Sequence, residues 1–155
     1  MNYLNKFKLK KKIAFVLGGS GTIGSETCIA LSQAGAKVLN IDIVENKILK
    51  NDSNIKFLFF NLKNLKKFEK FLKKTILKYG PPNIFINCSY PRDKKWSKNS
   101  FKNVSLPSLI ENTNLHLTSY IWSARLIAEI MINKKIEGSI IQLASTYGIV
   151  GQDSE

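Results

Sequence analysis

The sequence predicts an α/β fold in which a five-stranded parallel sheet, ordered 3-2-1-4-5, carries helices on both faces. Short apolar runs of strand length alternate along the 155 residues with longer stretches of helical periodicity, which is typical of parallel strands joined by right-handed crossovers. The first apolar run leads directly into a glycine-rich loop, which reads Gly18-Gly19-Ser20-Gly21-Thr22-Ile23-Gly24. The length suits one domain with its own core, and no internal repeat marks a second.

The first three strands and the first helix follow in order from the N-terminus. Ile13–Leu17 is apolar throughout, as expected of a strand that is buried on both faces. Residues 22–34 are predicted to form the first helix, and Gly35 stands where a helix C-cap glycine belongs. Lys37–Asp42 is the second predicted strand, and residues 55–60 are the third.

The second half of the chain continues the alternation. Residues 62–79 carry apolar side chains at helical spacing with lysines between them, which predicts an amphipathic helix with its lysines toward solvent. Residues 83–87 are the fourth predicted strand, and a polar loop of residues 90–105 follows. Residues 107–132 read as a long helix, and residues 139–144 read as the fifth strand.

The glycine loop and Asp42 together predict a dinucleotide site. Asp42 comes 18 residues after Gly24, at the end of the second apolar run, and this is the layout of a Rossmann-type βαβ unit. In such a unit the loop backbone and the helix N-terminus hold the pyrophosphate, while the acid accepts hydrogen bonds from the ribose hydroxyls. A 2′-phosphate would meet the like charge of Asp42, so the sequence predicts NAD rather than NADP.

The composition argues against several other partners. The net charge is +13, but 22 lysines stand against two arginines, and 15 residues are Asn. Phosphate recognition usually recruits Arg, so we interpret the charge as a solvated basic surface, which disfavours a nucleic-acid partner. No stretch approaches the roughly 20 apolar residues of a membrane span. Cys28 and Cys88 fit no metal or redox spacing, which favours reduced thiols in a cytoplasmic protein without a metal.

These motifs resemble those of the short-chain dehydrogenase/reductase family over nearly the whole chain. The glycine loop is similar to the family's Thr-Gly-(three residues)-Gly-Ile-Gly, with Leu17 for Thr and Thr22 for the middle Gly, and Gly21 offers an alternative register. Asn61-Leu62 resembles the pair that holds the adenine, with Asn61 in place of Asp. Asn87-Cys88-Ser89-Tyr90 stands where the family has Asn-Asn-Ala-Gly, which supports the sheet and borders the nicotinamide.

The resemblance also implies catalytic residues. Residues 139–148 are similar to the end of the family's fifth strand, which makes Ser145 the active-site serine that binds the substrate carbonyl or hydroxyl. The family's active-site Asn falls on Asn114 in one register and on His116 in another, and we prefer His116. A core or interface role is the alternative for this histidine.

The same resemblance implies an incomplete active site. The family's Tyr-(three residues)-Lys pair comes a dozen or more residues past Ser145, whereas ten residues follow it here, and Gly151 stands four residues after Tyr147. We therefore expect the cofactor-binding part of an NAD(P)-dependent oxidoreductase, C-terminally truncated after the fifth strand and inactive alone, that acts on a carbonyl or alcohol by hydride transfer. A non-catalytic dinucleotide-binding or regulatory module is the alternative, and a basic nucleic-acid-binding protein is less favoured.

Two further expectations concern partners. A fifth strand at the sheet edge, together with a long helix rich in apolar residues, predicts self-association or a completing chain. The segment from Tyr90-Pro91-Arg92 to Phe101 also resembles a subgroup associated with surface-glycan and flagellin-sugar pathways, which implies a sugar or sugar-nucleotide substrate.

Overall fold

Five parallel strands form one sheet in the order β3-β2-β1-β4-β5, which confirms the predicted topology. The computed structural model describes residues 3–92, 100, 102–146 and 149. Leu17 pairs with Ile41 on one side and with Asn87 on the other, so β1, β2 and β4 end together at one edge of the sheet. The strand bounds are β1 (Ile13–Leu17), β2 (Lys37–Asp42), β3 (Ile55–Phe59), β4 (Ile84–Asn87) and β5 (Ser139–Gln142).

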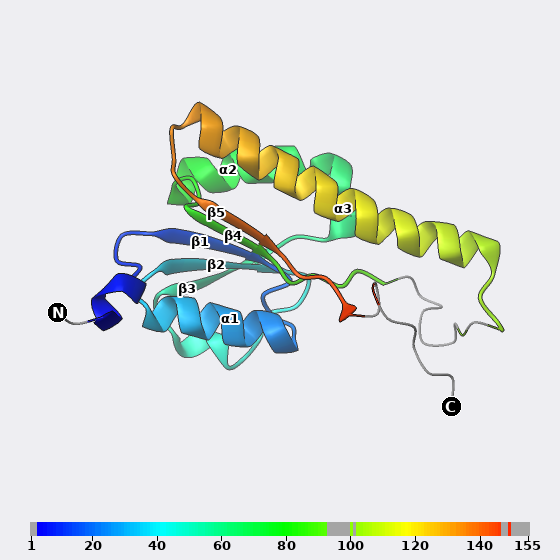
Figure 1. Ribbon diagram of the computed structural model, residues 1–155, viewed down its shortest axis with the longest axis horizontal. Helices are drawn as coiled ribbons and strands as arrows, with labels where there is room; N and C mark the ends of the chain where they lie inside the picture. Colours follow the sequence, from blue (N-terminus) through cyan, green and yellow to red (C-terminus); the bar gives the residue numbers. More distant parts are fainter. Residues whose placement is uncertain (1–2, 93–99, 101, 147–148, 150–155) are drawn as a thin grey trace.

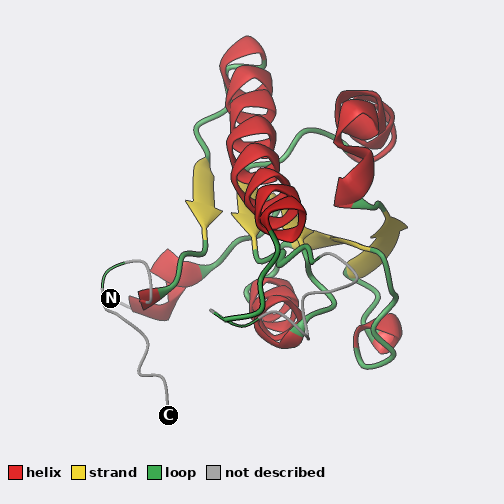
Figure 2. Ribbon diagram, turned by 90° about the vertical axis from the view of Figure 1, so that its right-hand side faces the viewer, coloured by secondary structure: helices red, strands yellow, loops and turns green. Residues whose placement is uncertain are grey.

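Helices cover both faces of the sheet (Figure 1). The helix α1 (Thr22–Gln33) lies on one face, whereas α2 (Phe68–Tyr79) and α3 (Leu106–Asn133) lie on the other, and the turned view of Figure 2 agrees. The lysines of α2 are exposed, as its amphipathic pattern predicts. No helix among the described residues is long and apolar enough to cross a membrane.

Two predicted boundaries differ from the structure by more than one residue. Residues Leu62–Lys67 form a 3-10 turn before α2, and Asn64 has the non-helical angles φ −98° and ψ 38°, so the prediction of one helix from residue 62 was wrong at its start. The fifth strand ends at Gln142 rather than at residue 144, because Gln142 pairs with Asn87, where β4 itself ends. Part of the loop 90–105, together with Tyr147 and Gly151, lies outside the described residues.

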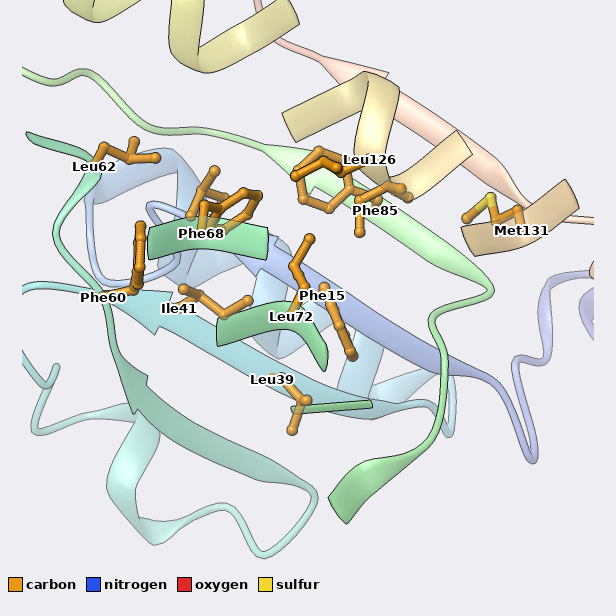
Figure 3. Close-up of a cluster of buried hydrophobic side chains, with 12 residues drawn as sticks. Phe15, Leu39, Ile41, Phe60, Leu62, Phe68, Leu72, Phe85, Leu126 and Met131 are labelled. Atoms are coloured by element: carbon orange, nitrogen blue, oxygen red, sulfur yellow. The ribbon is translucent and has the colours of Figure 1, made fainter. Parts of the chain in front are cut away.

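Two apolar clusters hold the layers together. Side chains from β1, β2 and β4 meet those of α2 and α3 on one face, including Phe15, Phe68 and Phe85 (Figure 3). The alternate residues of β1 and β2, including Val16 and Val38, pack under α1 around Cys28. The central strands are therefore buried on both faces, as their continuous apolar runs require.

Candidate cofactor site

A cleft of about 680 Å³ opens at the carboxyl ends of β1, β2 and β4. This is the point where the strand order reverses, and open α/β sheets bind ligands in such a crevice. Four segments line it: the glycine loop with the start of α1, the end of β2 with residues 43–46, residues 60–63, and residues 88–92.

Two of the loop glycines are required by close backbone contacts. Gly18 has φ +76°, and a Cβ there would lie 2.5 Å from the Cα of Ser89. A Cβ at Gly24 would overlap the carbonyl oxygen of Gly18. At Gly21, by contrast, a Cβ would approach nothing closer than 3.5 Å. The loop thus folds back on its own helix and against the end of β4, and this geometry needs glycine at positions 18 and 24.

The start of α1 leaves backbone donors at the cleft. Gly21 is the N-cap and supplies no side chain, so no side-chain oxygen caps the first turn of this 12-residue helix. Thr22, Ile23 and Gly24 line the cleft at this turn. Their N–H groups precede the first intrahelical partners and lie at the positive end of the helix dipole, which suits an anion such as a pyrophosphate.

Asp42 lies beside this loop with an ordered carboxylate. Its Oδ2 accepts a hydrogen bond from the Ser20 N–H at 2.9 Å, and its Oδ1 accepts one from the Ile43 N–H at 2.6 Å. Each carboxylate oxygen has further lone pairs, so the group can still accept hydrogen bonds from a ligand in the cleft. The acid predicted from the loop spacing therefore faces the loop directly.

The predicted adenine-side pair also lines the cleft. Asn61 caps the 3-10 turn by accepting a hydrogen bond from the Lys63 N–H at 2.9 Å, and Leu62 is buried. The Lys63 ammonium lies 3.6 Å from the Glu111 carboxylate, in an exposed ion pair. Asn61 thus fixes the chain direction at this end of the cleft.

Residues 87–90 lie at the other end of the cleft. Asn87 is fully buried beneath it, and its Oδ1 accepts hydrogen bonds from the Ser89 N–H at 3.1 Å and the Ser89 hydroxyl at 2.5 Å. Cys88, Ser89 and Tyr90 line the cleft itself, whereas Asn87 and Gly19 do not. The Tyr120 hydroxyl donates to the Ser89 carbonyl at 2.7 Å, which ties α3 to the end of β4.

Of the predicted catalytic residues, His116 contacts a residue that lines the cleft. The His116 ring packs edge-on against Tyr90 with the centroids 4.6 Å apart, and the Arg92 guanidinium lies 5.6 Å from the Tyr90 ring centroid. Burial lowers the pKa of His116, and a hydrogen bond with the Pro91 backbone opposes this shift. Asn114 and Ser145 are exposed and do not line the cleft.

The cysteines have raised pKa values. Burial raises the pKa of the Cys28 thiol to about 12, and burial also raises the pKa of Cys88. Both therefore stay protonated near neutral pH and are weak nucleophiles. Within the described part of the chain, no three His, Cys, Asp or Glu side chains come together as metal ligands would.

Asn46 and Asn40 also belong to the site, although no sequence motif predicted them. Asn46 lines the cleft, and its Nδ2 donates to the Ser20 carbonyl at 3.3 Å. Asn40, in the middle of β2, contacts the Ser20 hydroxyl. The one signal for Asn40 was a polar residue inside an otherwise apolar strand.

The glycine cradle, the open helix N-terminus and the ordered acid fit a dinucleotide and define an α/β domain of the dinucleotide-binding class. The chain belongs to the short chain dehydrogenase family, whose sequence pattern it matches over residues 12–155. Members of this family bind NAD(P), so this is an NAD(P)-binding domain of the oxidoreductase type.

The chain is similar to several known proteins. It is 30% identical over 149 residues to the post-translational flagellin modification protein A of Campylobacter coli, and 26% identical over 156 residues to an acetoacetyl-CoA reductase of Acinetobacter sp. (strain RA3849). These alignments cover 91% and 92% of this chain but only 58% and 59% of those proteins. The chain therefore spans less than two thirds of the length of either relative.

Solved structures share the fold. A short chain dehydrogenase from Leptospira borgpetersenii with bound NAD+ superposes with a TM-score of 0.85 at 19% identity, over 99% of this chain and 58% of that one. A gluconate 5-dehydrogenase from Burkholderia cenocepacia, in complex with NADP and tartrate, gives a TM-score of 0.82 at 17% identity, over 97% and 60%. At these identities the likeness shows the fold alone.

Proposed function

We propose that this chain binds NAD(H) in the cleft and forms the cofactor-binding part of an oxidoreductase. Asp42 would accept hydrogen bonds from the adenosine ribose, and the first turn of α1 would hold the pyrophosphate. The ordered Asp42 carboxylate beside the uncapped helix start carries this proposal. The bound nicotinamide supplies or accepts the hydride, and a carbonyl or hydroxyl of the substrate is its partner.

The charges around Asp42 support NAD over NADP. Glu45 lines the same end of the cleft, so two carboxylates would face a 2′-phosphate there. The Lys63 ammonium at this end is paired with Glu111. A ribose 2′-hydroxyl, by contrast, can donate to the carboxylate of Asp42.

The substrate side is proposed from resemblance. Ser145 would bind the substrate oxygen, and His116, or Asn114 in the alternative register, would occupy the position of the family's active-site Asn. A sugar or sugar nucleotide is the proposed substrate, which is supported by the resemblance of residues 90–101 and by the similarity to a flagellin modification protein. A completing chain or a second copy is the proposed partner, because α3 and β5 expose apolar side chains.

Calorimetric titration with NADH and NADPH tests this proposal. The native chain should bind NADH more tightly than NADPH. Asp42→Ala should weaken NADH binding about tenfold or more, since a charged hydrogen bond is lost. It should also reduce the preference for NADH over NADPH. Glu26→Ala, which removes the same charge from an exposed site on α1, is the matched control and should change neither affinity. A folded native chain that binds neither nucleotide would contradict the proposal.

A further inference from the structure

We infer that Asn40 is a positioning residue of the cofactor site: it fixes the glycine loop to β2 and thereby orients Asp42 toward the adenosine ribose. The inference rests on the proposed binding of NAD(H). Asn40 is not part of the glycine loop, and it is not the acid at the end of β2.

Asn40 is a polar side chain in an apolar environment. It is 1% exposed and lies on the α1 face of the sheet, beside Val16 and Val38 of the apolar cluster under that helix. It pairs with Val16 in β1 and with Phe57 in β3. A buried amide is costly unless it is hydrogen-bonded, so its partners identify what it does.

The partner of Asn40 is Ser20, at the tip of the glycine loop. The Asn40 Nδ2 donates to the Ser20 Oγ at 2.9 Å, and the same hydroxyl lies 3.4 Å from the Asn40 Oδ1. The Ser20 N–H donates to Asp42, and the Ser20 carbonyl accepts from Asn46. The hydroxyl, the N–H and the carbonyl of Ser20 are thus all bonded to β2 or to the segment that follows it.

The same contact explains the glycine at position 19. A Cβ at Gly19 would lie 2.5 Å from the Asn40 Oδ1 and 3.0 Å from the Cys28 Sγ. Gly19 is buried and does not line the cleft. The absence of a side chain at Gly19 therefore lets the loop backbone pack closely against the Asn40 side chain.

The consequence for the cofactor is a fixed geometry between two of its contacts. The loop that leads into the pyrophosphate-binding turn and the acid that binds the ribose are joined through one residue, Ser20. A carboxylate held in this way cannot turn aside to admit a 2′-phosphate. Loosening Ser20 should therefore weaken NADH binding and also reduce the discrimination against NADPH.

The test measures NADH and NADPH affinities and thermal stability for native protein, Asn40→Leu, Ser20→Ala and the double variant. Asn40→Leu keeps the side-chain size but removes both contacts to Ser20. Each single variant should lose about tenfold in NADH affinity and narrow the NADH-to-NADPH ratio, and the double variant should lose little more than either. Such non-additivity is the signature of two residues that act through one contact.

Asn83→Leu is the matched control. The Oδ1 of Asn83 accepts a hydrogen bond from the Ile13 N–H at 3.0 Å, at the opposite edge of the sheet. Replacing Asn83 with Leu should therefore lower thermal stability without changing the ratio of NADH to NADPH affinity. If Asn40→Leu does not fold, Ser20→Ala carries the test alone. A folded Ser20→Ala or Asn40→Leu with the native ratio would overturn the inference only, and a folded native chain that does not bind NADH would overturn the proposed function with it.

Discussion

The glycine loop is held by hydrogen bonds and close backbone contacts, whereas the β5 edge of the same sheet leaves apolar side chains exposed. At the loop, every hydrogen-bonding group of Ser20 has a partner, and Gly18 and Gly24 sit against backbone. At the edge, β4 is the one strand of the described residues that pairs with β5, and Ile141 is 46% exposed. The neighbouring α3 leaves Leu117 and Ile121 each 58% exposed.

The two sides of the sheet therefore depend on other protein surfaces to different degrees. The proposed nucleotide contacts come from residues 17–24, 41–46, 60–63 and 88–92, and hydrogen bonds of Ser20 join the glycine loop to β2 among them. The α3–β5 side carries apolar area that another protein surface would bury with a gain in free energy. We therefore expect the glycine loop and Asp42 to bind the nucleotide whether or not another protein surface covers α3 and β5.

The largest effect is expected from a change inside the loop. In Gly24→Val the new Cβ would overlap the Gly18 carbonyl oxygen, so the loop must shift or the helix must move away. We expect a loss of about 3 kcal/mol in the free energy of unfolding and no measurable NADH binding. Thermal melting and calorimetry would measure the two effects.

Gly21→Ala is the control for that change. Its Cβ has ordinary van der Waals space, so the melting temperature should stay near the native value. A native-like Gly24→Val protein, or equal damage from both variants, would show that the loop is not held by the contact between Gly24 and Gly18.

The fold was more predictable than the site, for a physical reason. The bounds of β1 and β2 were predicted correctly because continuous apolar runs are bounded there by a glycine loop and an acid. The start of α2 was predicted incorrectly, because over a single turn a 3-10 turn and an α-helix give the same spacing of apolar side chains. Spacing placed Asp42 near the loop, but the contact between Asn40 and Ser20 depends on how β2 and the loop pack.

A smaller effect is expected on the α3 side. We expect the native chain to associate at high concentration through the exposed residues of α3. The double variant Leu117→Lys with Ile121→Lys should weaken this association about tenfold or more, because two exposed apolar side chains of the contact surface become charged. Sedimentation velocity over a range of concentrations would measure it.

Leu77→Lys provides the comparison for that variant. Leu77 is an exposed apolar residue of α2, on the same face of the sheet but on another helix. The Leu77→Lys substitution should leave the association of the chain with itself unchanged. A native chain that stays monomeric at all concentrations, or an equal effect of Leu77→Lys, would remove α3 as the contact surface.

The smallest effect is a pH dependence from His116. Burial lowers its pKa in the folded chain, so below the ordinary value of 6.5 the unfolded chain binds a proton more readily than the folded chain. The free energy of unfolding should therefore decline as the pH falls through 6.5. Above about pH 7 the imidazole is neutral in both states, so His116 should add no pH dependence there. Denaturant titrations at several pH values would measure this decline, and His116→Asn should make it smaller. An equal decline in the native protein and the variant would contradict a contribution from His116.

Hydrogen–deuterium exchange with and without NADH shows whether the nucleotide contacts the glycine loop or the α3 and β5 surface, because it follows both regions in one experiment. We predict that saturating NADH slows exchange in the loop around Gly18 and Gly24 and at the end of β2. Exchange in β5 and along the exposed face of α3 should stay as in the free chain. Protection of β5 and α3 by NADH with no change in the loop would contradict the account.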